Sequence, residues 1–366
     1  MKGKIINVFP EGITSQGFCS FYNYILQNLK LIIFVKNGSL IGNSLIFKRI
    51  GIYFNEKGYD IEYHHCSLDP DKLWAVVIKS LNIALIDSSI TNEKNHFCLD
   101  CEFETIDVNE CFNKQYFKQN QKFISEIYKN FSICMNRSYM YLKAANQIHN
   151  NLANINTLAL NISKINNLKQ NLKNKIFISS KCCPKFKRHL FTTAFSSEGI
   201  VTYADSNYIN YENKYVLNGN AGTGKTNILK YIAEEAFIRG YTVEIYHNPL
   251  LPSKIEHILI PDINTAVMSS NELNNISFDG LQLYLGNFLD CSIIIKNKEE
   301  MDVDNNNYKI LINHSLKLMA ESKLIYDEID KYYVMDINFD KVLKTIDMLV
   351  CKIEFIEKIN CNQIHP

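Results

Sequence analysis

The chain has 366 residues, of which 46% are hydrophobic and 21% are charged, and its formal net charge is +1. This composition and length are typical of a globular protein of about two domains. The small net charge excludes a strong overall electrostatic attraction to nucleic acid or to anionic lipid. No apolar stretch approaches the roughly 20 residues that a bilayer crossing needs, and no signal-peptide core is recognisable near the N-terminus. The 11 cysteines are odd in number and irregularly spaced, which does not suit a disulfide framework, so we expect a cytoplasmic protein.

An internal repeat organises the chain. A shift of 182 residues aligns a long segment of the first half with the second half without gaps. The matched positions include Gly17 with Gly199, Tyr59 with Tyr241, His65 with His247, Pro70 with Pro252, and Ala84 with Ala266. Agreement at one fixed offset over so long a segment indicates a tandem duplication.

The first copy opens with the pattern of a strand, a loop and a helix. Residues 31–35 form an apolar run typical of a buried strand, and residues 45–54 have the spacing of a helix. A second apolar strand covers residues 83–87 and ends in Asp87. The stretch His64–Asp71 follows another strand, where it could contact a ligand, or where Asp69 and Asp71 could merely cap a helix.

Apolar residues then recur in steps of three and four. In the first copy they cover residues 124–148 and 152–172, and in the second copy they cover residues 311–332, where the offset falls to 177. This spacing predicts an antiparallel helical hairpin appended to each domain, with the first hairpin broken near Asn150-Asn151. Residues 175–188 are the expected linker, so the predicted domains are residues 1–174 and 189–366.

The second copy contains a glycine-rich loop between a short strand, residues 215–217, and a helix with one apolar face. Its residues, Gly219, Asn220, Ala221, Gly222, Thr223, Gly224, Lys225 and Thr226, fit G-x-x-x-x-G-K-[ST] at every fixed position. The glycines let successive N–H groups form an anion-binding nest, and the helix N-terminus adds positive charge. We expect Lys225 to reach the β and γ phosphates of ATP or GTP and the Thr226 hydroxyl to bind Mg²⁺. The strand and helix on either side disfavour the alternative, a glycine-rich turn with an exposed lysine.

The aligned loop of the first copy, Asn37–Ser44, lacks the same chemistry. Asn37 replaces the first glycine, Leu40 the middle glycine and Asn43 the lysine. Leu40 has a side chain where phosphate needs bare backbone, and loss of the lysine removes a charge-assisted contact worth about 1.5–3 kcal/mol. The first loop is therefore predicted to be vestigial.

The acidic partner of the second loop is also missing. A P-loop ATPase usually has an aspartate at the end of a second buried strand, where it holds Mg²⁺. Asp87 has this place in the first copy, but Ser269 follows the matching strand, residues 265–268, in the second. Three explanations remain open. Ser269 could bind Mg²⁺ weakly, with charge from Asp262, Glu272 or Asp279; the two halves could share one site; or the protein could bind nucleotide and barely hydrolyse it.

These segments resemble an uncharacterised family of bacterial tandem P-loop ATPases, in the P-loop NTPase superfamily. The resemblance covers nearly the whole chain and rests on TSQGFCSFYNYIL, GYDIEYHHCSLDPDKLWAVVI and IALID in the first half, and on HLFTTAFSSEG and GNAGTGKT in the second. It implies an α/β fold of two tandem P-loop domains, each a parallel sheet flanked by helices. Family members usually carry a complete loop and an aspartate in both halves, so the departures at Asn37, Leu40, Asn43 and Ser269 bear directly on hydrolysis.

The expected function is Mg²⁺-dependent hydrolysis of ATP or GTP at the second loop. A kinase acting on a small molecule or nucleotide and a nucleotide-dependent switch or scaffold with little turnover are the alternatives. No motif in the sequence indicates whether adenine or guanine is recognised, and none identifies a residue that could act as the general base. We expect no membrane or nucleic-acid partner, whereas a protein partner or a homo-oligomer is compatible with the sequence.

Overall fold

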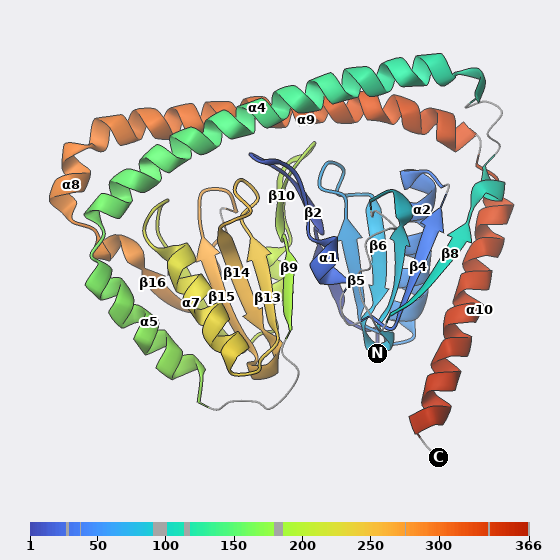
Figure 1. Ribbon diagram of the computed structural model, residues 1–366, viewed down its shortest axis with the longest axis horizontal. Coiled ribbons are helices and arrows are strands. Elements are labelled where there is room, and N and C mark those ends of the chain that lie inside the picture. The colour runs from blue at the N-terminus through green and yellow to red at the C-terminus, as the bar shows by residue number, and fades with distance from the viewer. Residues whose placement is uncertain are drawn as a thin grey trace. The chain divides into compact units, whose positions relative to one another are not determined.

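The computed structural model describes residues 1–26, 29–36, 38–90, 101–112, 118–178, 186–274, 276–335 and 337–364. These residues form two six-stranded sheets, mostly parallel and flanked by helices (Figure 1). The α/β class is therefore as predicted. No helix in the described ranges combines the length and the apolar character that a membrane crossing requires.

The first sheet contains strands from the first half of the chain. Its order is β1 (Ile5–Val8), β5 (Ile61–His65), β6 (Leu73–Ile78), β7 (Ile83–Asp87), β4 (Leu31–Lys36) and β8 (Glu102–Asp107). β6 runs antiparallel to both of its neighbours, and the other pairs are parallel. Helix α2 (Leu40–Glu56) follows β4 and packs on this sheet.

The second sheet repeats the first strand for strand. Its order is β9 (Lys187–Leu190), β13 (Val243–His247), β14 (Ile255–Ile260), β15 (Thr265–Ser270), β12 (Asn213–Asn218) and β16 (Leu281–Tyr284). β14 is again the antiparallel member, and helix α7 (Lys225–Ile238) follows β12. Local details repeat as well, because Asn82 and Asn264 have φ values of 54° and 49° before β7 and β15.

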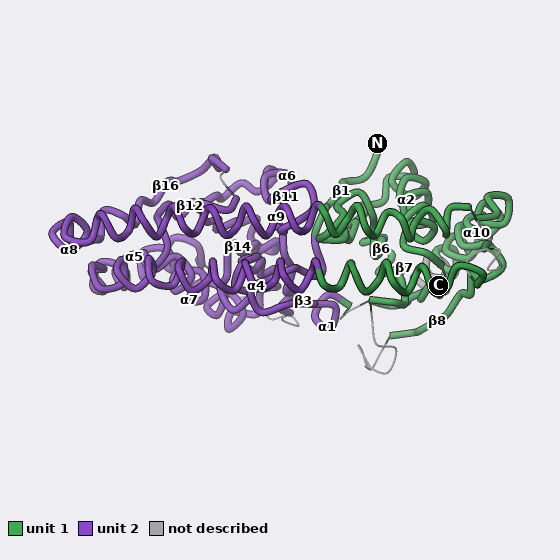
Figure 2. Tube along the Cα trace, turned by 90° about the horizontal axis from the view of Figure 1, so that it is seen from above, with its two compact units in different colours: residues 1–8, 26–133, 321–366 green, residues 9–25, 134–320 purple. Residues whose placement is uncertain are grey.

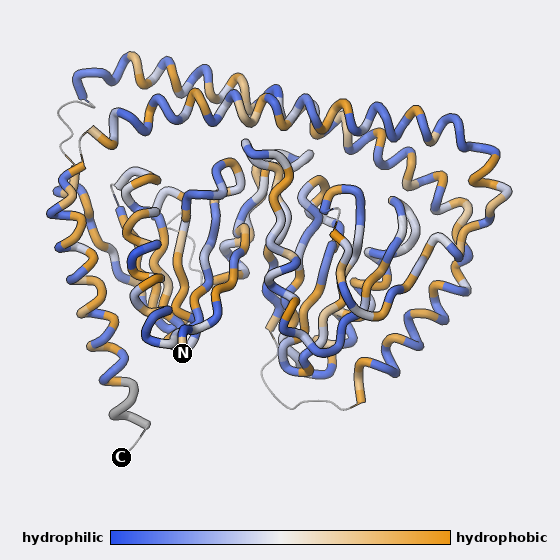
Figure 3. Tube along the Cα trace, turned by 180° about the vertical axis from the view of Figure 1, so that it is seen from behind, coloured by the Kyte–Doolittle hydropathy of each residue, from blue (hydrophilic) through white to orange (hydrophobic). Residues whose placement is uncertain are grey.

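Continuous apolar runs build the two cores. A strand covered on both faces needs such a run rather than an alternating one, and all five residues of Leu31–Val35 in β4 are buried. The predicted apolar face of α7 is buried too, at Ile228, Leu229, Ile232, Ala233 and Ala236. Figure 3 shows the hydrophobic colour gathered along the strands, while it alternates with the hydrophilic colour along the long helices.

Smaller elements complete the fold. Two hairpins, β2 (Glu11–Thr14) with β3 (Gly17–Ser20) and β10 (Thr193–Ser196) with β11 (Gly199–Thr202), occupy matching places in the repeat. The short helices are α1 (Tyr22–Ile25), α6 (Ala204–Tyr208) and α8 (Cys291–Lys296), and the 3-10 turns are η1 (Lys79–Leu81), η2 (Ser88–Ile90), η3 (Asn109–Cys111), η4 (Pro261–Ile263) and η5 (Leu285–Phe288).

The predicted helical hairpins are wrong in two respects. Helix α4 (Gln121–Ala159) runs through Asn150-Asn151 without a break, and the chain turns only before α5 (Ile162–Ile176), where the Asn161 side chain caps the new helix. The partner of α4 is α9 (Lys298–Met335) from the other half of the chain, rather than α5. Ser138 and Ser315 lie in the seam between α4 and α9, with their hydroxyl oxygens 2.7 Å apart. The apolar stripes are therefore real packing faces, but they face the other copy's helix.

The chain divides into two compact units (Figure 2). Unit 1 comprises residues 1–8, 26–133 and 321–366, and unit 2 comprises residues 9–25 and 134–320. Within unit 1, α10 (Phe339–Ile364) packs on α2, and within unit 2, α5 packs on α7. Each unit thus joins a sheet from one half of the chain to a terminal helix from the other half, which differs from the predicted segments 1–174 and 189–366. Of the predicted linker 175–188, residues 179–185 lie outside the described ranges.

Candidate functional site

The glycine-rich loop of unit 2 lies between β12 and α7. β12 pairs in parallel with β15 and β16, so the loop leaves the carboxyl edge of the sheet, where ligands bind in α/β folds. Gly222 has φ 80° and Gly224 has φ 93°, a region in which a side chain would be strained. Gly224 is the N-cap of α7 and offers no side-chain cap. The first N–H groups of α7 therefore remain available to an anion.

A cavity of about 640 Å³ opens beside this loop. Besides the loop, the cavity is lined by the first turns of α7, the end of β15 with the residues after it, the start of β14, Asn248 after β13, and a part of α4 with Leu160 after it. The lining residues that matter below are Lys225, Thr226, Lys254, Glu256, Ser269, Glu272 and His149. All of the predicted loop residues except Gly219 thus line one cavity with Ser269, together with charged residues that no sequence motif connected to them.

Lys225 and Thr226 begin α7 at the cavity. The Lys225 ammonium donates to the carbonyl oxygens of Gly219 and Asn220. Burial lowers the pKa of Lys225 to about 8, against the opposing charge of Glu272. The Thr226 hydroxyl donates to the Ile255 carbonyl oxygen, 3.4 Å away. Both side chains are therefore held by backbone carbonyl oxygens, and no carboxylate of the described residues forms an ion pair with the lysine.

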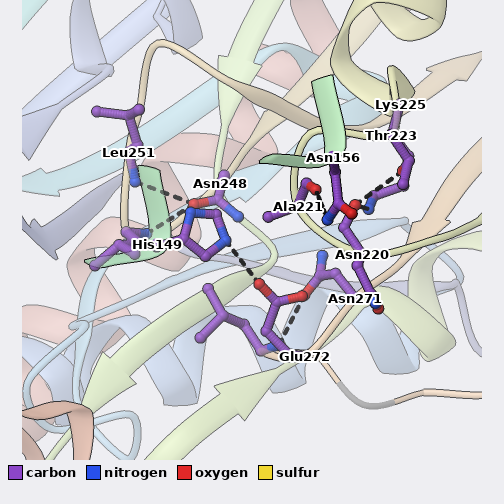
Figure 4. Close-up of polar contacts among 12 residues, drawn as sticks. His149, Asn156, Asn220, Ala221, Thr223, Lys225, Asn248, Leu251, Asn271 and Glu272 are labelled. Carbon is purple, nitrogen blue, oxygen red and sulfur yellow. Dashed lines mark hydrogen bonds and ion pairs between the residues drawn. The ribbon is translucent and has the colours of Figure 1, made fainter. Parts of the chain in front are cut away.

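Of the three acids expected to compensate for Ser269, Glu272 lines the cavity. It lies 2.7 Å from His149 of α4, and Figure 4 shows the two side chains pointing toward each other. Burial would raise the pKa of Glu272, but the hydrogen bond and charge of His149 hold it at about 2. Asp262 instead accepts from the Thr242 N–H, and Asp279 pairs with Lys214. Neither of these two aspartates lines the cavity.

Glu256 is a second carboxylate of the site, and the sequence analysis missed it. It is 1% exposed in β14. Its Oε1 accepts from the Asn271 and Asn274 amides at 2.7 and 3.2 Å, and the Asn274 amide also donates to the Ser269 carbonyl oxygen at 2.8 Å. Its Oε2 has no hydrogen-bond partner in the described part of the chain. Burial raises the pKa of Glu256 to about 7, although these amides and Thr193 oppose the shift.

The signal for Glu256 was present in the sequence. A carboxylate in an otherwise apolar central strand, residues 255–260, needs a reason, because charged residues are rarely buried without a partner. The aligned residue of the first copy is Trp74, so the repeat itself gave no acidic position to compare.

Ser269 is 2% exposed near the end of β15. Its N–H donates to Nδ1 of His257, 3.1 Å away. Burial lowers the pKa of His257 to about 3, so this imidazole is neutral and accepts at Nδ1. The serine is thus held in the sheet by its backbone and lies next to the Asn274–Glu256 network.

The matching region of unit 1 is closed by its own residues. α2 begins at Leu40, and the Ser39 side chain caps it by accepting from the Gly42 N–H at 3.1 Å. The Asn43 amide donates to Oδ2 of Asp87 at 2.8 Å. The other oxygen of Asp87 accepts from the Ser89 N–H and hydroxyl at 2.9 and 2.6 Å. The residues that align with the lysine and the acid therefore bind each other, and a helical turn replaces the nest; Asn37 lies outside the described residues.

The His64–Asp71 stretch has a structural role in unit 1. His65 Nδ1 lies 2.6 Å from the Pro70 carbonyl oxygen, and burial lowers the pKa of His65 to about 4. Asp69 pairs with Lys72 at 3.0 Å, and Lys72 also pairs with Asp330 of α9. The stretch anchors α9 to the first sheet.

Helix α4 covers the glycine-rich loop in unit 2. The Asn156 amide donates to the Ala221 carbonyl oxygen at 2.7 Å (Figure 4), and the Thr157 hydroxyl donates to the Gly222 carbonyl oxygen at 3.3 Å. A Cβ atom on Gly222 would lie 2.1 Å from the Ala153 carbonyl oxygen. Sequence alone could not reveal this cover, because α4 comes from the first half of the chain.

Comparisons with protein-family models, curated proteins and solved structures found no match for this chain.

Proposed function

We propose that unit 2 binds a nucleoside triphosphate, ATP or GTP, in the cavity beside Gly219–Thr226 and hydrolyses it. One observation carries this proposal: the loop ends a parallel strand and opens α7 with Lys225 and Thr226 at a cavity of about 640 Å³. Backbone N–H groups, a helix N-terminus and a lysine that forms no ion pair with a carboxylate in the described part of the chain form an arrangement suited to phosphate. The cavity is large enough for a small ligand of this class.

The oxygen atoms at the site suit Mg²⁺. Mg²⁺ binds through carboxylate, hydroxyl and phosphate oxygens, and the cavity offers the Thr226 and Ser269 hydroxyls together with the carboxylates of Glu256 and Glu272. The Oε2 of Glu256 accepts no hydrogen bond among the described residues and lies 3.6 Å from Nε2 of His257, so it is a buried oxygen that a cation could satisfy. Thr226 and Ser269 would hold the ion with one of these carboxylates, and the ion would neutralise phosphate charge during transfer.

The two carboxylates are suited to different tasks. The pKa of Glu272 is about 2 and that of Glu256 is about 7, so near neutral pH one is ionised and the other can take up a proton. Such divergent environments mark acid–base assignments in active sites. We assign Glu272 to charge compensation and Glu256 to accepting the proton of the attacking water.

Calorimetric titrations with non-hydrolysable ATP and GTP analogues in the presence of Mg²⁺, followed by phosphate-release assays with ATP and GTP, test the proposal. We expect one nucleotide per chain and phosphate release without any added acceptor. Release that requires a second substrate would indicate a kinase. The absence of binding for both ATP and GTP analogues would contradict the proposal.

A nucleotide-dependent switch is the second candidate, because α4 contacts the loop at Ala221 and Gly222. A phosphate group that enters the nest would compete with these contacts. Hydrogen exchange of residues 149–157 with and without the analogue tests this candidate, which requires lower protection in the complex.

A further inference from the structure

The cavity contains a second lysine that no sequence motif predicted. Lys254 directly precedes β14 and lines the same cavity as Lys225. It forms no ion pair among the described residues, and burial lowers its pKa, with Glu272 opposing the shift. Glu272 therefore acts on Lys254 only from beyond ion-pair distance, and a partly buried ammonium without a direct ion pair is stabilised when an anion joins it.

The repeat provides an internal comparison. Lys254 aligns with Lys72 of the first copy, and in unit 1 that lysine pairs with Asp69, Asp330 and Asp327. Burial alone would lower the pKa of Lys72, but Asp330 and Asp69 raise it. The same position of the repeat is thus neutralised in unit 1.

None of the three acids is retained in unit 2. With the same offsets, Asp69 aligns with Leu251, Asp327 with Asn150 and Asp330 with Ala153. The lysine has been kept while all of its counter-ions have been replaced by uncharged residues. Asn150 and Ala153 line the cavity with Lys254, so a ligand can take the place that the acids have in unit 1.

We propose that Lys254 is a second phosphate-binding lysine, which contacts the terminal phosphate of a nucleoside triphosphate. Lys254 is next to Ile255, whose carbonyl oxygen accepts from the Thr226 hydroxyl. It therefore lies toward the Thr226 end of the loop, where the β and γ phosphates belong. The loop and Lys225 hold the β phosphate, which a diphosphate shares, as well as the γ phosphate, whereas Lys254 contacts the γ phosphate alone and so distinguishes a triphosphate from a diphosphate.

This inference rests on the proposed function, and three variants test it. Calorimetry compares Lys254→Ala, Lys225→Ala and Lys72→Ala for binding of a non-hydrolysable ATP analogue, ADP and inorganic triphosphate. We expect Lys254→Ala to weaken binding of the ATP analogue and inorganic triphosphate at least tenfold, and binding of ADP less than threefold. Lys225→Ala should weaken binding of all three ligands, and Lys72→Ala should change none of these affinities while lowering the melting temperature. Lys254→Arg should recover most of the triphosphate affinity.

The outcomes are separable. If the wild type binds the analogue and Lys254→Ala binds it equally well, or loses ADP and analogue affinity to the same extent, the role of Lys254 is wrong and the proposed function stands. If the wild type binds no nucleotide, the proposed function is wrong. The inorganic triphosphate titrations then decide the role of Lys254 by themselves, and equal binding by Lys254→Ala overturns it. A melting temperature of Lys254→Ala close to that of the wild type shows that the loss is local.

Discussion

At the scale of single residues, aligned positions of the two copies have different surroundings and different contacts. Lys225 faces a cavity, whereas the aligned Asn43 holds Asp87 through its amide. Lys225→Ala should weaken triphosphate binding at least tenfold, since about 1.4 kcal/mol corresponds to a factor of ten. The matched control, Asn43→Ala, should leave binding unchanged. Titration of both variants measures the difference, and equal losses would show that both loops hold phosphate.

If Lys225 binds phosphate as proposed, its lowered pKa should make nucleotide affinity depend on pH. Phosphate binds the charged ammonium, which is the minor form above pH 8 because the pKa of Lys225 is about 8 in the free protein. A bound triphosphate raises that pKa, so above pH 8 binding must take up a proton, and affinity should fall about tenfold per pH unit. Calorimetry at pH 7, 8 and 9 in buffers of different ionisation enthalpy measures both the affinity and the proton uptake. Constant affinity from pH 7 to 9 would contradict the assignment.

Sequence reasoning predicted the part of the candidate site that one local motif encodes. Residues 220–226 of the loop line one cavity because the motif connects adjacent elements, β12 and α7, and Ser269 joins them because β15 pairs with β12. Glu256, Lys254 and His149 come from other elements, and only tertiary structure brings them there. The replacement of the acids around Lys254 was visible in the alignment, but its meaning depended on the ion pairs of Lys72.

At the scale of elements, the sequence predicted strands and helices better than their partners. Heptad spacing shows which face of a helix is buried, but it does not show what covers that face. The stripes on α4 and α9 are equally good faces for a neighbour within one copy or for the other copy. The preference of proteins for short connections favoured pairing within one copy. In the structure, each long helix pairs with the long helix of the other copy.

The start of α2 gives a prediction at this scale. Ser39 caps α2 by accepting from the Gly42 N–H, and an N-cap replaced by alanine typically costs about 1 kcal/mol. Ser39→Ala should lower the free energy of unfolding of unit 1 by about that amount and leave nucleotide binding intact. Ser132→Ala, at an exposed mid-helix position of α4, is the control and should change stability by less than about 0.5 kcal/mol. Chemical denaturation measures both variants, and equal effects would contradict the role of the cap.

At the scale of the whole molecule, the order of strands within each sheet follows from the duplication, but the composition of the units does not. Two copies of one sequence pattern form the same sheet twice. The exchange of α5 and α10 depends on the course of α4 and α9, which each contribute residues to both units. The same local sequence pattern is compatible with a terminal helix that packs on the sheet of its own copy or on the sheet of the other copy. Tertiary packing therefore decides between the two.

Buried titratable groups of both units together set the stability of the protein in acid. The pKa values of His65, His247 and His257 are lowered by burial to about 4, 4 and 3. As pH falls below 6.5, the unfolded chain binds protons at these three histidines while the folded chain does not, so folding is progressively destabilised until pH 4. Glu256 acts in the opposite direction. Its folded pKa of about 7 lies above the unfolded value of 4.5, so its proton stabilises the folded state as pH falls through this range.

Between pH 4.5 and 6.5 the unfolded chain therefore binds, from these four groups, three protons more at the histidines and one fewer at Glu256. Each proton corresponds to about 1.4 kcal/mol per pH unit, so the free energy of unfolding should fall by about 2.7 kcal/mol per pH unit on acidification. Glu256→Gln removes the opposing proton, and its slope should be steeper by about 1.4 kcal/mol per pH unit. The same variant should be more stable than the wild type at pH 8, because an ionised carboxylate is no longer buried. Urea denaturation at half-unit steps from pH 5 to 8 measures both curves. Parallel curves would show that Glu256 titrates normally and would remove it as the proton acceptor of the site.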